Sequence, residues 1–202
     1  MWRFHYVSTD EVYGELSDDS NDKFKETTSI KPNSPYSVSK TSGDLLTLAY
    51  HRTFWLDVSV SRCSNNYGPN QDKEKLIPHF IWLLMNWNKV TLYGNWKNIR
   101  DWLYVEDHCD AIWKIFNEWI NGSVYNIWWD TEKTNLEITN ILLENFWLNE
   151  DWISFVADRP WHDKRYAIDF SKISNELWRK PKYNFEEWIK STIEFYKNYF
   201  DK

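Results

Sequence analysis

The chain has 202 residues and a formal net charge of −6, with its Lys and Arg residues scattered. This length fits one or two domains with a real core, and the acidic balance argues against nucleic acid as a partner. No apolar run reaches membrane-spanning length and no secretory leader precedes the first strand, so we expect a cytoplasmic protein with no membrane partner. Cys63 and Cys109 are too few for a disulfide framework or a metal site, and buried free thiols are expected.

Strand-like and helix-like segments alternate along the chain. A buried strand is predicted over residues 3–8, and the polar segment 15–34 is typical of an active-site loop. A helix over 36–55 is predicted next, with Ser34 as its N-cap and Pro35 in its first turn.

The remaining segments continue this alternation. Strands or extended segments are predicted at 58–63, 90–93, 123–127 and 164–170, and loops at 64–69 and 94–101. Helices are predicted at 76–86, 105–119, 136–146, 171–177 and 185–199. Strands separated by helices predict an α/β fold.

The amounts of Trp and Gly are abnormal. The chain has 15 Trp and only 5 Gly, whereas glycine usage averages about 7%. Several Trp residues stand where turns and helix ends favour glycine: Trp87, Trp96, Trp128, Trp129 and Trp178. We therefore predict that many of these are glycine in the living protein, encoded by UGA codons that the source organism reads as glycine. True aromatic enrichment is the alternative, and UGG codons at these positions would favour it.

Two short motifs predict a proton-handling site. Ser8-Thr9-Asp10-Glu11 follows the first strand, at the place where open sheets hold their chemistry. Tyr36 stands four residues before Lys40, so both share a helix face, and a nearby ammonium favours the phenolate. Because consecutive strand residues point to opposite faces, Asp10 and Glu11 face one substrate only if the backbone turns there. This set of groups suits proton removal coupled to redox or elimination.

Each motif taken alone has a more ordinary interpretation. A Ser-Thr-Asp-Glu run is more often a helix N-cap, and a Tyr-x-x-x-Lys pair more often lies on a surface. Arg100 and Asp101 suit a surface ion pair, and His162 suits an exposed polar position. The histidines show no metal-ligand spacing, so no metal site is expected. Only the occurrence of all the motifs in one order favours catalysis.

Five segments occur in order over nearly the whole chain: Ser8–Gly14, Tyr36–Lys40, Arg62–Pro69, Glu74–Pro78 and Arg100–His108. Together they resemble the dTDP-glucose 4,6-dehydratases of the extended short-chain dehydrogenase/reductase superfamily, in their C-terminal part. No Gly-x-Gly-x-x-Gly turn occurs, so we expect a fragment without the N-terminal nucleotide-binding half. The expected fold is a partial Rossmann-type parallel sheet with a smaller C-terminal substrate-binding α/β domain. Residues 1–66, with some later segments, would belong to the NAD-binding domain, and 67–202 mainly to the nucleotide-sugar-binding domain.

The resemblance implies NAD as cofactor, dTDP-glucose as substrate and a homodimer that pairs through the helix at 36–55. It implies catalytic roles for Thr9, Asp10, Glu11, Tyr36 and Lys40. Cofactor contacts are implied for Ser8, Tyr36, Lys40 and Asn66. Nucleotide-sugar contacts are implied for Asn65, Lys75, Leu76, Thr91, Tyr93, Arg100, Asn135, Arg159 and His162. The family has glycine where this chain has Trp55, Trp87, Trp96, Trp128, Trp129, Trp161 and Trp178.

The implied reaction turns dTDP-glucose into dTDP-4-keto-6-deoxyglucose by oxidation at C4, loss of water across C5 and C6, and reduction at C6. Another NAD-dependent nucleotide-sugar epimerase or decarboxylase would share Tyr36 and Lys40. Epimerisation at C4 needs no acid to expel a C6 hydroxyl, so the Asp10–Glu11 pair distinguishes the two classes. A non-catalytic nucleotide-sugar-binding module, or half of an oligomer, is the alternative outside enzymes.

Overall fold

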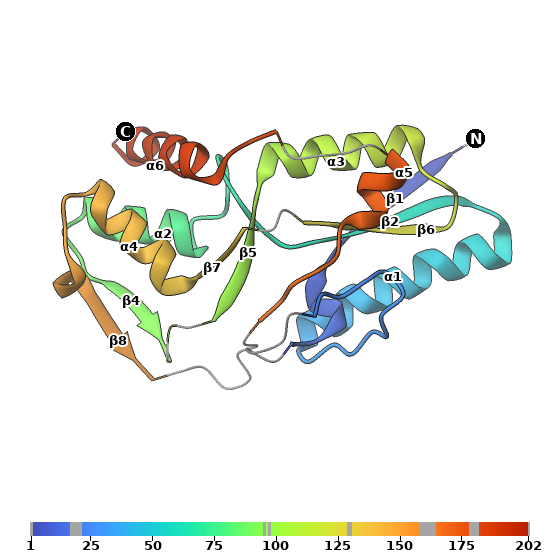
Figure 1. Cartoon of the computed structure of the whole chain (residues 1–202), viewed down its shortest axis with the longest axis horizontal. Coiled ribbons are helices and arrows are strands. Elements are labelled where there is room, and N and C mark those ends of the chain that lie inside the picture. The colour runs from blue at the N-terminus through green and yellow to red at the C-terminus, as the bar shows by residue number, and fades with distance from the viewer. Residues whose placement is uncertain are drawn as a thin grey trace.

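A three-stranded parallel sheet forms the half of the molecule that contains the N-terminus (Figure 1). The computed structural model describes residues 2–16, 22–94, 96, 98–128, 131–157, 165–177 and 182–201. The strand order is β1 (Arg3–Thr9), β2 (Asp57–Cys63) and β6 (Ser123–Ile127). Figure 1 shows α1 (Pro35–Phe54) on one side of this sheet, with α3 (Val105–Glu118) and α5 (Ser171–Leu177) on the other. The predicted α/β fold with a parallel sheet is therefore confirmed.

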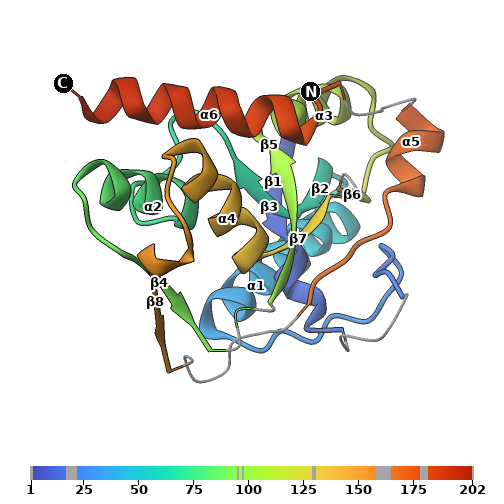
Figure 2. The same cartoon turned by 60° about the vertical axis from the view of Figure 1, so that its left-hand side comes forward.

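Helices and short strands form the second half of the molecule, where α6 (Phe185–Phe200) runs along one side (Figure 2). The other helices there are α2 (Leu76–Met85), α4 (Asn135–Asn145) and the short η2 (Glu150–Trp152). Strand β4 (Val90–Tyr93) pairs in parallel with β8 (Ile153–Val156). Strand β5 (Ile99–Tyr104) lies between β3 (Asn65–Tyr67), to which it is parallel, and β7 (Glu132–Thr134), to which it is antiparallel.

The two halves have separate apolar cores. One core gathers side chains of α2, α4 and α6, including Ile77, Ile138 and Ile193, all almost fully buried. A second gathers Leu103 with Ile115 and Ile127, from β5, α3 and β6. Later segments of the chain therefore return to pack on the first sheet, while the boundary near residue 66 stays a prediction.

The longer elements were predicted correctly and the shortest strands were missed. The prediction of a loop over 94–101 is wrong for its last three residues, because Ile99–Asp101 begin β5 and pair with β7. The loop predicted over 64–69 is likewise wrong over β3. A strand of three residues cannot display alternation, and buried charged residues such as Arg100 and Asp101 hide the apolar pattern of β5.

The start of α1 follows the prediction. The Ser34 hydroxyl accepts a hydrogen bond from the Ser37 backbone N–H at 3.0 Å, and Ser37 Oγ accepts one from the Ser34 N–H at 2.9 Å. Pro35 is the first helical residue. This reciprocal cap satisfies two backbone N–H donors that the start of a helix otherwise leaves without partners. It fixes the first residue of α1 and therefore the position of Tyr36 in the first turn.

Several Trp residues adopt backbone angles that favour glycine. Trp55, Trp87 and Trp96, which the sequence placed at glycine positions, have φ values of 58°, 55° and 51°. Trp147, which the sequence analysis missed, has a φ of 58°. Trp128 has no such angle and is fully buried, while Trp129, Trp161 and Trp178 lie outside the described residues.

The cysteines are both free, but only one is buried. Cys63 is buried at the end of β2, whereas Cys109 is exposed on α3, so the expectation of two buried thiols is wrong for Cys109. Cys109 lies on the solvent side of α3, next to buried His108 and half-buried Asp110.

Candidate active site

The acidic pair stands on a tight turn at the end of β1. Thr9 is extended and is the N-cap of η1 (Asp10–Tyr13), and its hydroxyl accepts a hydrogen bond from the Glu11 N–H at 3.3 Å. The chain therefore turns at Asp10, which is the condition that the sequence set for Asp10 and Glu11 to face one substrate. The N-cap interpretation and the catalytic one are compatible, because the cap is what takes Asp10 and Glu11 out of the strand's alternation.

Asp10 has the environment of an acid rather than of a carboxylate. Its side chain is buried, and burial together with the negative charges of Glu11 and Asp101 raises its pKa to about 8. Arg100 and the hydrogen bond from the Thr9 hydroxyl, at 3.3 Å, oppose that shift. Glu11 is only half-buried. Two adjacent carboxyl groups in different surroundings can be protonated differently at neutral pH, which is what an acid and a base require.

The phenol of Tyr36 faces this acidic turn. Burial and the negative charges of Glu11, Cys63 and Asp10 raise the pKa of Tyr36. The expectation that Lys40 lowers this pKa is not met, because the Lys40 ammonium donates to the Val7 carbonyl at 2.8 Å and lies 5.0 Å from the Tyr6 ring centre. The sequence spacing fixed the helix face of the two residues, but it could not reveal that a backbone carbonyl would hold the cation.

Polar groups of β1, β3 and α3 complete this side of the site. The Asn66 amide donates to the Ser64 carbonyl at 3.2 Å, and its oxygen lies 2.9 Å from His108 Nδ1. Burial lowers the pKa of His108 to about 4, so its ring is neutral and Nδ1–H is the donor in this pair. The Ser8 hydroxyl is buried and has no hydrogen-bond partner among the described residues. Ser8 and Asn66 thus lie beside Cys63, as its hydrogen bonds to both residues show.

Arg100 and Asp101 are buried parts of the site rather than a surface ion pair. The Asp101 carboxylate accepts hydrogen bonds from Ser64 Oγ at 2.8 Å and from the Thr131 N–H at 2.6 Å. The Arg100 guanidinium donates to the Ile99 carbonyl and lies 4.8 Å from the Tyr166 ring centre. Because Arg100 opposes the rise of the Asp10 pKa, its positive charge on β5 lies within electrostatic reach of the acidic turn.

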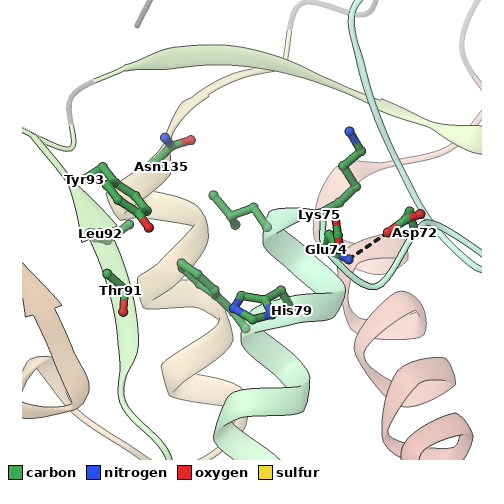
Figure 3. A pocket seen from close by; sticks show the side chains of 10 residues that line it. Asp72, Glu74, Lys75, His79, Thr91, Leu92, Tyr93 and Asn135 are labelled. Carbon is green, nitrogen blue, oxygen red and sulfur yellow. Dashed lines mark hydrogen bonds between the residues drawn. The ribbon is translucent and has the colours of Figure 1, made fainter. Parts of the chain in front are cut away.

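A cavity of about 740 Å³ opens between α2, β4 and the start of α4 (Figure 3). Five residues predicted to contact the nucleotide sugar line it: Lys75, Leu76, Thr91, Tyr93 and Asn135. Asn65 and Arg100 do not line it and lie on β3 and β5. Arg159 and His162 lie outside the described residues.

The sequence analysis missed three polar residues of this cavity, namely Asp72, Glu74 and His79. Figure 3 shows His79 on α2 one turn beyond Lys75, on the same side of the cavity. The spacing of four residues from Lys75 was the available signal, since residues so spaced share a helix face.

Two negative findings apply to the described residues. Within those ranges, no group of three or more His, Cys, Asp or Glu side chains is arranged to hold a metal ion. None of the helices that the structure describes is both long and apolar enough to cross a bilayer.

A parallel sheet with flanking helices, and a Tyr36–Lys40 helix beside a carboxylate turn, define the short-chain dehydrogenase/reductase class. The chain belongs to the GDP-mannose 4,6-dehydratase family, whose model matches residues 1–192. It is 48% identical over 195 residues to a dTDP-glucose 4,6-dehydratase of Actinoplanes sp., covering 96% of this chain and 60% of that protein. The Escherichia coli dTDP-glucose 4,6-dehydratase is 46% identical over 209 residues, with 96% and 58% covered. The chain thus spans about 60% of the length of these relatives.

Solved structures show the same likeness. The dTDP-glucose 4,6-dehydratase DesIV from Streptomyces venezuelae, solved with NAD and TYD bound, superimposes with a TM-score of 0.94 at 41% identity, over 97% of this chain and 60% of DesIV. A UDP-glucuronic acid 4-epimerase from Bacillus cereus, solved with UDP-glucuronic acid and NAD, gives 0.89 at 25% identity, over 98% and 62%. The fold is shared with epimerases, and the higher identity lies with the dehydratases.

Proposed function

We propose that the protein is an NAD-dependent lyase that converts dTDP-glucose into dTDP-4-keto-6-deoxyglucose. The observation that carries the proposal is the buried Asp10, whose pKa of about 8 keeps it protonated at neutral pH, directly before the less buried Glu11. An acid next to a base is what water elimination needs and what a C4 epimerase does not need. The identity of 44–48% to dTDP-glucose 4,6-dehydratases supports the same choice.

The residues present fit the nicotinamide end of a bound NAD. Ser8 lies near the end of β1 and Asn66 lies in β3, and the Ser8 hydroxyl is buried without a partner among the described residues. Together with Tyr36 and Lys40 they would hold the cofactor there. When bound, NAD+ takes a hydride from C4 of the sugar and later returns it to C6.

In the first step, the phenolate form of Tyr36 takes the proton of the C4 hydroxyl while Thr9 orients that hydroxyl. Because burial and the nearby carboxylates raise the pKa of Tyr36, this step requires a nearby positive charge that favours the phenolate. Lys40, held by the Val7 carbonyl, keeps a positive charge on the same side of the helix. The C4 ketone formed in this way acidifies the C5 proton, since the resulting carbanion is an enolate. Without that oxidation neither carboxyl group could remove the proton.

In the second step, Glu11 takes the C5 proton and Asp10 gives a proton to the departing C6 hydroxyl. Asp10 suits the acid because it is buried and protonated, and Glu11 suits the base because it is more exposed. Arg100 lies close enough to Asp10 to oppose the rise of its pKa, so its positive charge acts on the acid of this step.

The nucleotide diphosphate would occupy the cavity between α2 and β4. Lys75 offers a cation, Asn135 an amide, and Thr91 and Tyr93 polar side chains to a diphosphate and a base. Asn65, Arg159 and His162 are further proposed contacts. Residues 1–66 would serve mainly the cofactor, and residues 67–202 mainly the nucleotide sugar.

We further propose a cytoplasmic homodimer that pairs through α1. This helix exposes a row of apolar side chains, among them Val38, Leu45, Leu46 and Phe54. Such a row in a helix flanking a sheet is better explained by a partner surface than by solvent.

The test is turnover of dTDP-glucose with NAD+ in deuterated water. The protein extended by the N-terminal nucleotide-binding half that its relatives have is expected to form the 4-keto-6-deoxy product with deuterium at C5, and the chain of 202 residues alone to be a poor enzyme. Glu11→Gln should keep C4 oxidation but lose C5 exchange, whereas the matched surface variant Glu118→Gln should behave like wild type. Exchange that continues unchanged in Glu11→Gln would rule out Glu11 as the base. Nucleotide-sugar binding without any oxidation would favour the non-catalytic module.

A further inference from the structure

A buried chain of hydrogen bonds runs beneath the acidic turn. The Tyr13 hydroxyl donates to Asn126 Oδ1 at 2.8 Å and accepts from Arg62 Nη1 at 2.8 Å. Arg62 Nε donates to Asp44 Oδ2 at 2.7 Å. All four residues are at most 2% exposed. The other carboxylate oxygen of Asp44, Oδ1, is buried without a hydrogen-bond partner among the described residues, so this buried charge depends on Arg62.

The chain connects the elements that carry the proposed catalytic groups. Tyr13 ends η1, the turn that holds Asp10 and Glu11. Asp44 lies on α1, one helical turn beyond Lys40. Arg62 comes from β2 and Asn126 from β6. The Tyr13 phenol and the Arg62 guanidinium therefore link the turn to the helix.

We propose that Tyr13 is a positioning residue that fixes the acidic turn against the helix of Tyr36 and Lys40; the inference rests on the proposed function. A phenolic hydroxyl both donates and accepts, so it can join the Arg62 donor to the Asn126 acceptor. Its ring stacks on Phe24 at 5.1 Å and lies 4.8 Å from the Arg62 guanidinium carbon. Tyr13→Phe would keep these ring contacts and remove only the link.

The test compares Tyr13→Phe with Tyr196→Phe. Tyr196 is also a buried phenol, and its hydroxyl donates to the carbonyls of Gly68 and Gln71 at 3.2 and 2.9 Å. Both variants lose one buried hydroxyl, so a merely structural effect should lower the melting temperature in each. Only Tyr13→Phe should disturb the acidic turn.

Two measurements report on the position of the acidic turn that holds Asp10 and Glu11. Titration of the Asp10 carboxyl by ¹³C NMR should move down by about one pH unit in Tyr13→Phe, because water reaches the loosened turn while Glu11, Asp101 and Arg100 stay in place. The ratio of C5 exchange to C4 oxidation should fall about tenfold, since misplacement of the acid and base affects only elimination. Tyr196→Phe should change neither.

An unchanged Asp10 titration and an unchanged ratio in folded Tyr13→Phe would overturn the proposal. If that variant does not fold, Asp44→Asn, which keeps an oxygen for Arg62 but removes the charge, should move both readouts in the same direction. No such movement in Asp44→Asn would also overturn it. The carboxyl titration needs no turnover, so it tests the positioning role even if the dehydratase proposal fails.

A second inference comes from the backbone. Among the described residues, five that are not glycine have φ values in the left-handed region, and four of them are Trp55, Trp87, Trp96 and Trp147. The fifth is Asn70, a residue type that tolerates this region. For a bulky side chain a positive φ is an outlier, and it is the conformation that glycine adopts freely.

Three of the four Trp residues end helices in the way glycine does. The Trp55 N–H donates to the His51 carbonyl at the end of α1. After α2, the Trp87 N–H donates to Leu84 and the Asn88 N–H to Leu83. After α4, the Trp147 N–H donates to Glu144 and the Leu148 N–H to Leu143. The last two have the paired hydrogen bonds of a Schellman motif, whose left-handed position is usually glycine.

Packing in the core does not explain why tryptophan would stand at these positions. The side chains of Trp55, Trp87 and Trp147 are 83%, 75% and 96% exposed. By contrast, Trp102 is 5% exposed and lies in regular β5. We infer that residues 55, 87, 96 and 147 are glycine in the protein that the source cell makes, encoded by UGA, while Trp102 is a true tryptophan encoded by UGG.

Mass spectrometry of peptides from the native protein tests this directly. Glycine is expected at positions 55, 87, 96 and 147, and tryptophan at position 102, which is the internal control. The gene should carry UGA at the four positions and UGG at the fifth. Tryptophan in the native peptides at the four positions, or UGG codons there, would overturn the inference.

Discussion

The Lys40 ammonium donates a hydrogen bond to the Val7 carbonyl at 2.8 Å. This contact joins the first turns of α1 to the end of β1, two residues before the N-cap of the acidic turn. The cation is therefore fixed by the backbone of the strand rather than by the phenol of Tyr36. The Lys40 ammonium therefore joins α1 to β1 and also places a positive charge near the acidic turn.

Replacing Lys40 should therefore affect both stability and C4 oxidation. In Lys40→Met the Val7 carbonyl loses its charged donor, which should lower the free energy of unfolding by about 1–2 kcal/mol. Chemical denaturation and single-turnover reduction of NAD+ would measure the two effects. Lys190→Met, on the exposed face of α6, is the control. Normal C4 oxidation in Lys40→Met would contradict the catalytic role.

Asp10 should make the protein less stable as the pH rises. Burial raises its pKa in the folded chain to about 8, above the value of about 4 expected when unfolded. Between these values the folded state binds more protons, so the free energy of unfolding falls with increasing pH. Asp10→Asn should remove this loss and be more stable by at least about 1 kcal/mol at pH 9, with elimination abolished. Denaturation at pH 5 and pH 9 is the measurement. Asp201→Asn, at the exposed end of α6, should keep the wild-type slope, and an equal slope in Asp10→Asn would contradict the assignment.

The sequence predicted the long helices and central strands because their apolar periodicity and caps are local signals. Ser34 with Pro35 located the start of α1 correctly, and the Tyr36–Lys40 spacing placed both on one face. The partner of Lys40 could not be predicted, since it is a carbonyl 33 residues away in the chain. The burial of Arg100 and Asp101 was also missed, because it depends on the pairing of β5 with β3 and β7.

Two neutral histidines should make the fold sensitive to acid. Burial lowers the pKa values of His5 and His108 to about 4 in the folded chain. The His5 ring lies 2.7 Å from Ser59 Oγ and 2.9 Å from Ser61 Oγ, and these neutral hydroxyls do not offset the cost of burying its charged form. Below pH 6.5 the unfolded chain binds more protons, so the free energy of unfolding falls as the pH drops toward 4.

The His5→Gln variant should reduce this acid sensitivity, because glutamine keeps polar contacts but does not titrate. Thermal melts from pH 7 to pH 4 would show a shallower loss than in wild type. His79→Gln, which replaces an exposed ring on α2, should retain the wild-type slope. An identical slope in His5→Gln would show that His5 does not contribute.

Lys75 provides the sharpest test of the cavity between α2 and β4. Its side chain is exposed at the start of α2 and lines the cavity with Thr91 and Asn135 (Figure 3). A hydrogen bond to a charged group contributes about 1.5–3 kcal/mol, so Lys75→Met should raise KM for dTDP-glucose about tenfold or more. Because the acidic turn lies elsewhere, kcat should change little. The matched control is Lys89→Met, which also removes one positive charge. Lys89 is exposed after α2 and does not line the cavity. If both variants bind the nucleotide sugar equally well, the diphosphate does not contact Lys75, and the assignment of the cavity to the nucleotide fails.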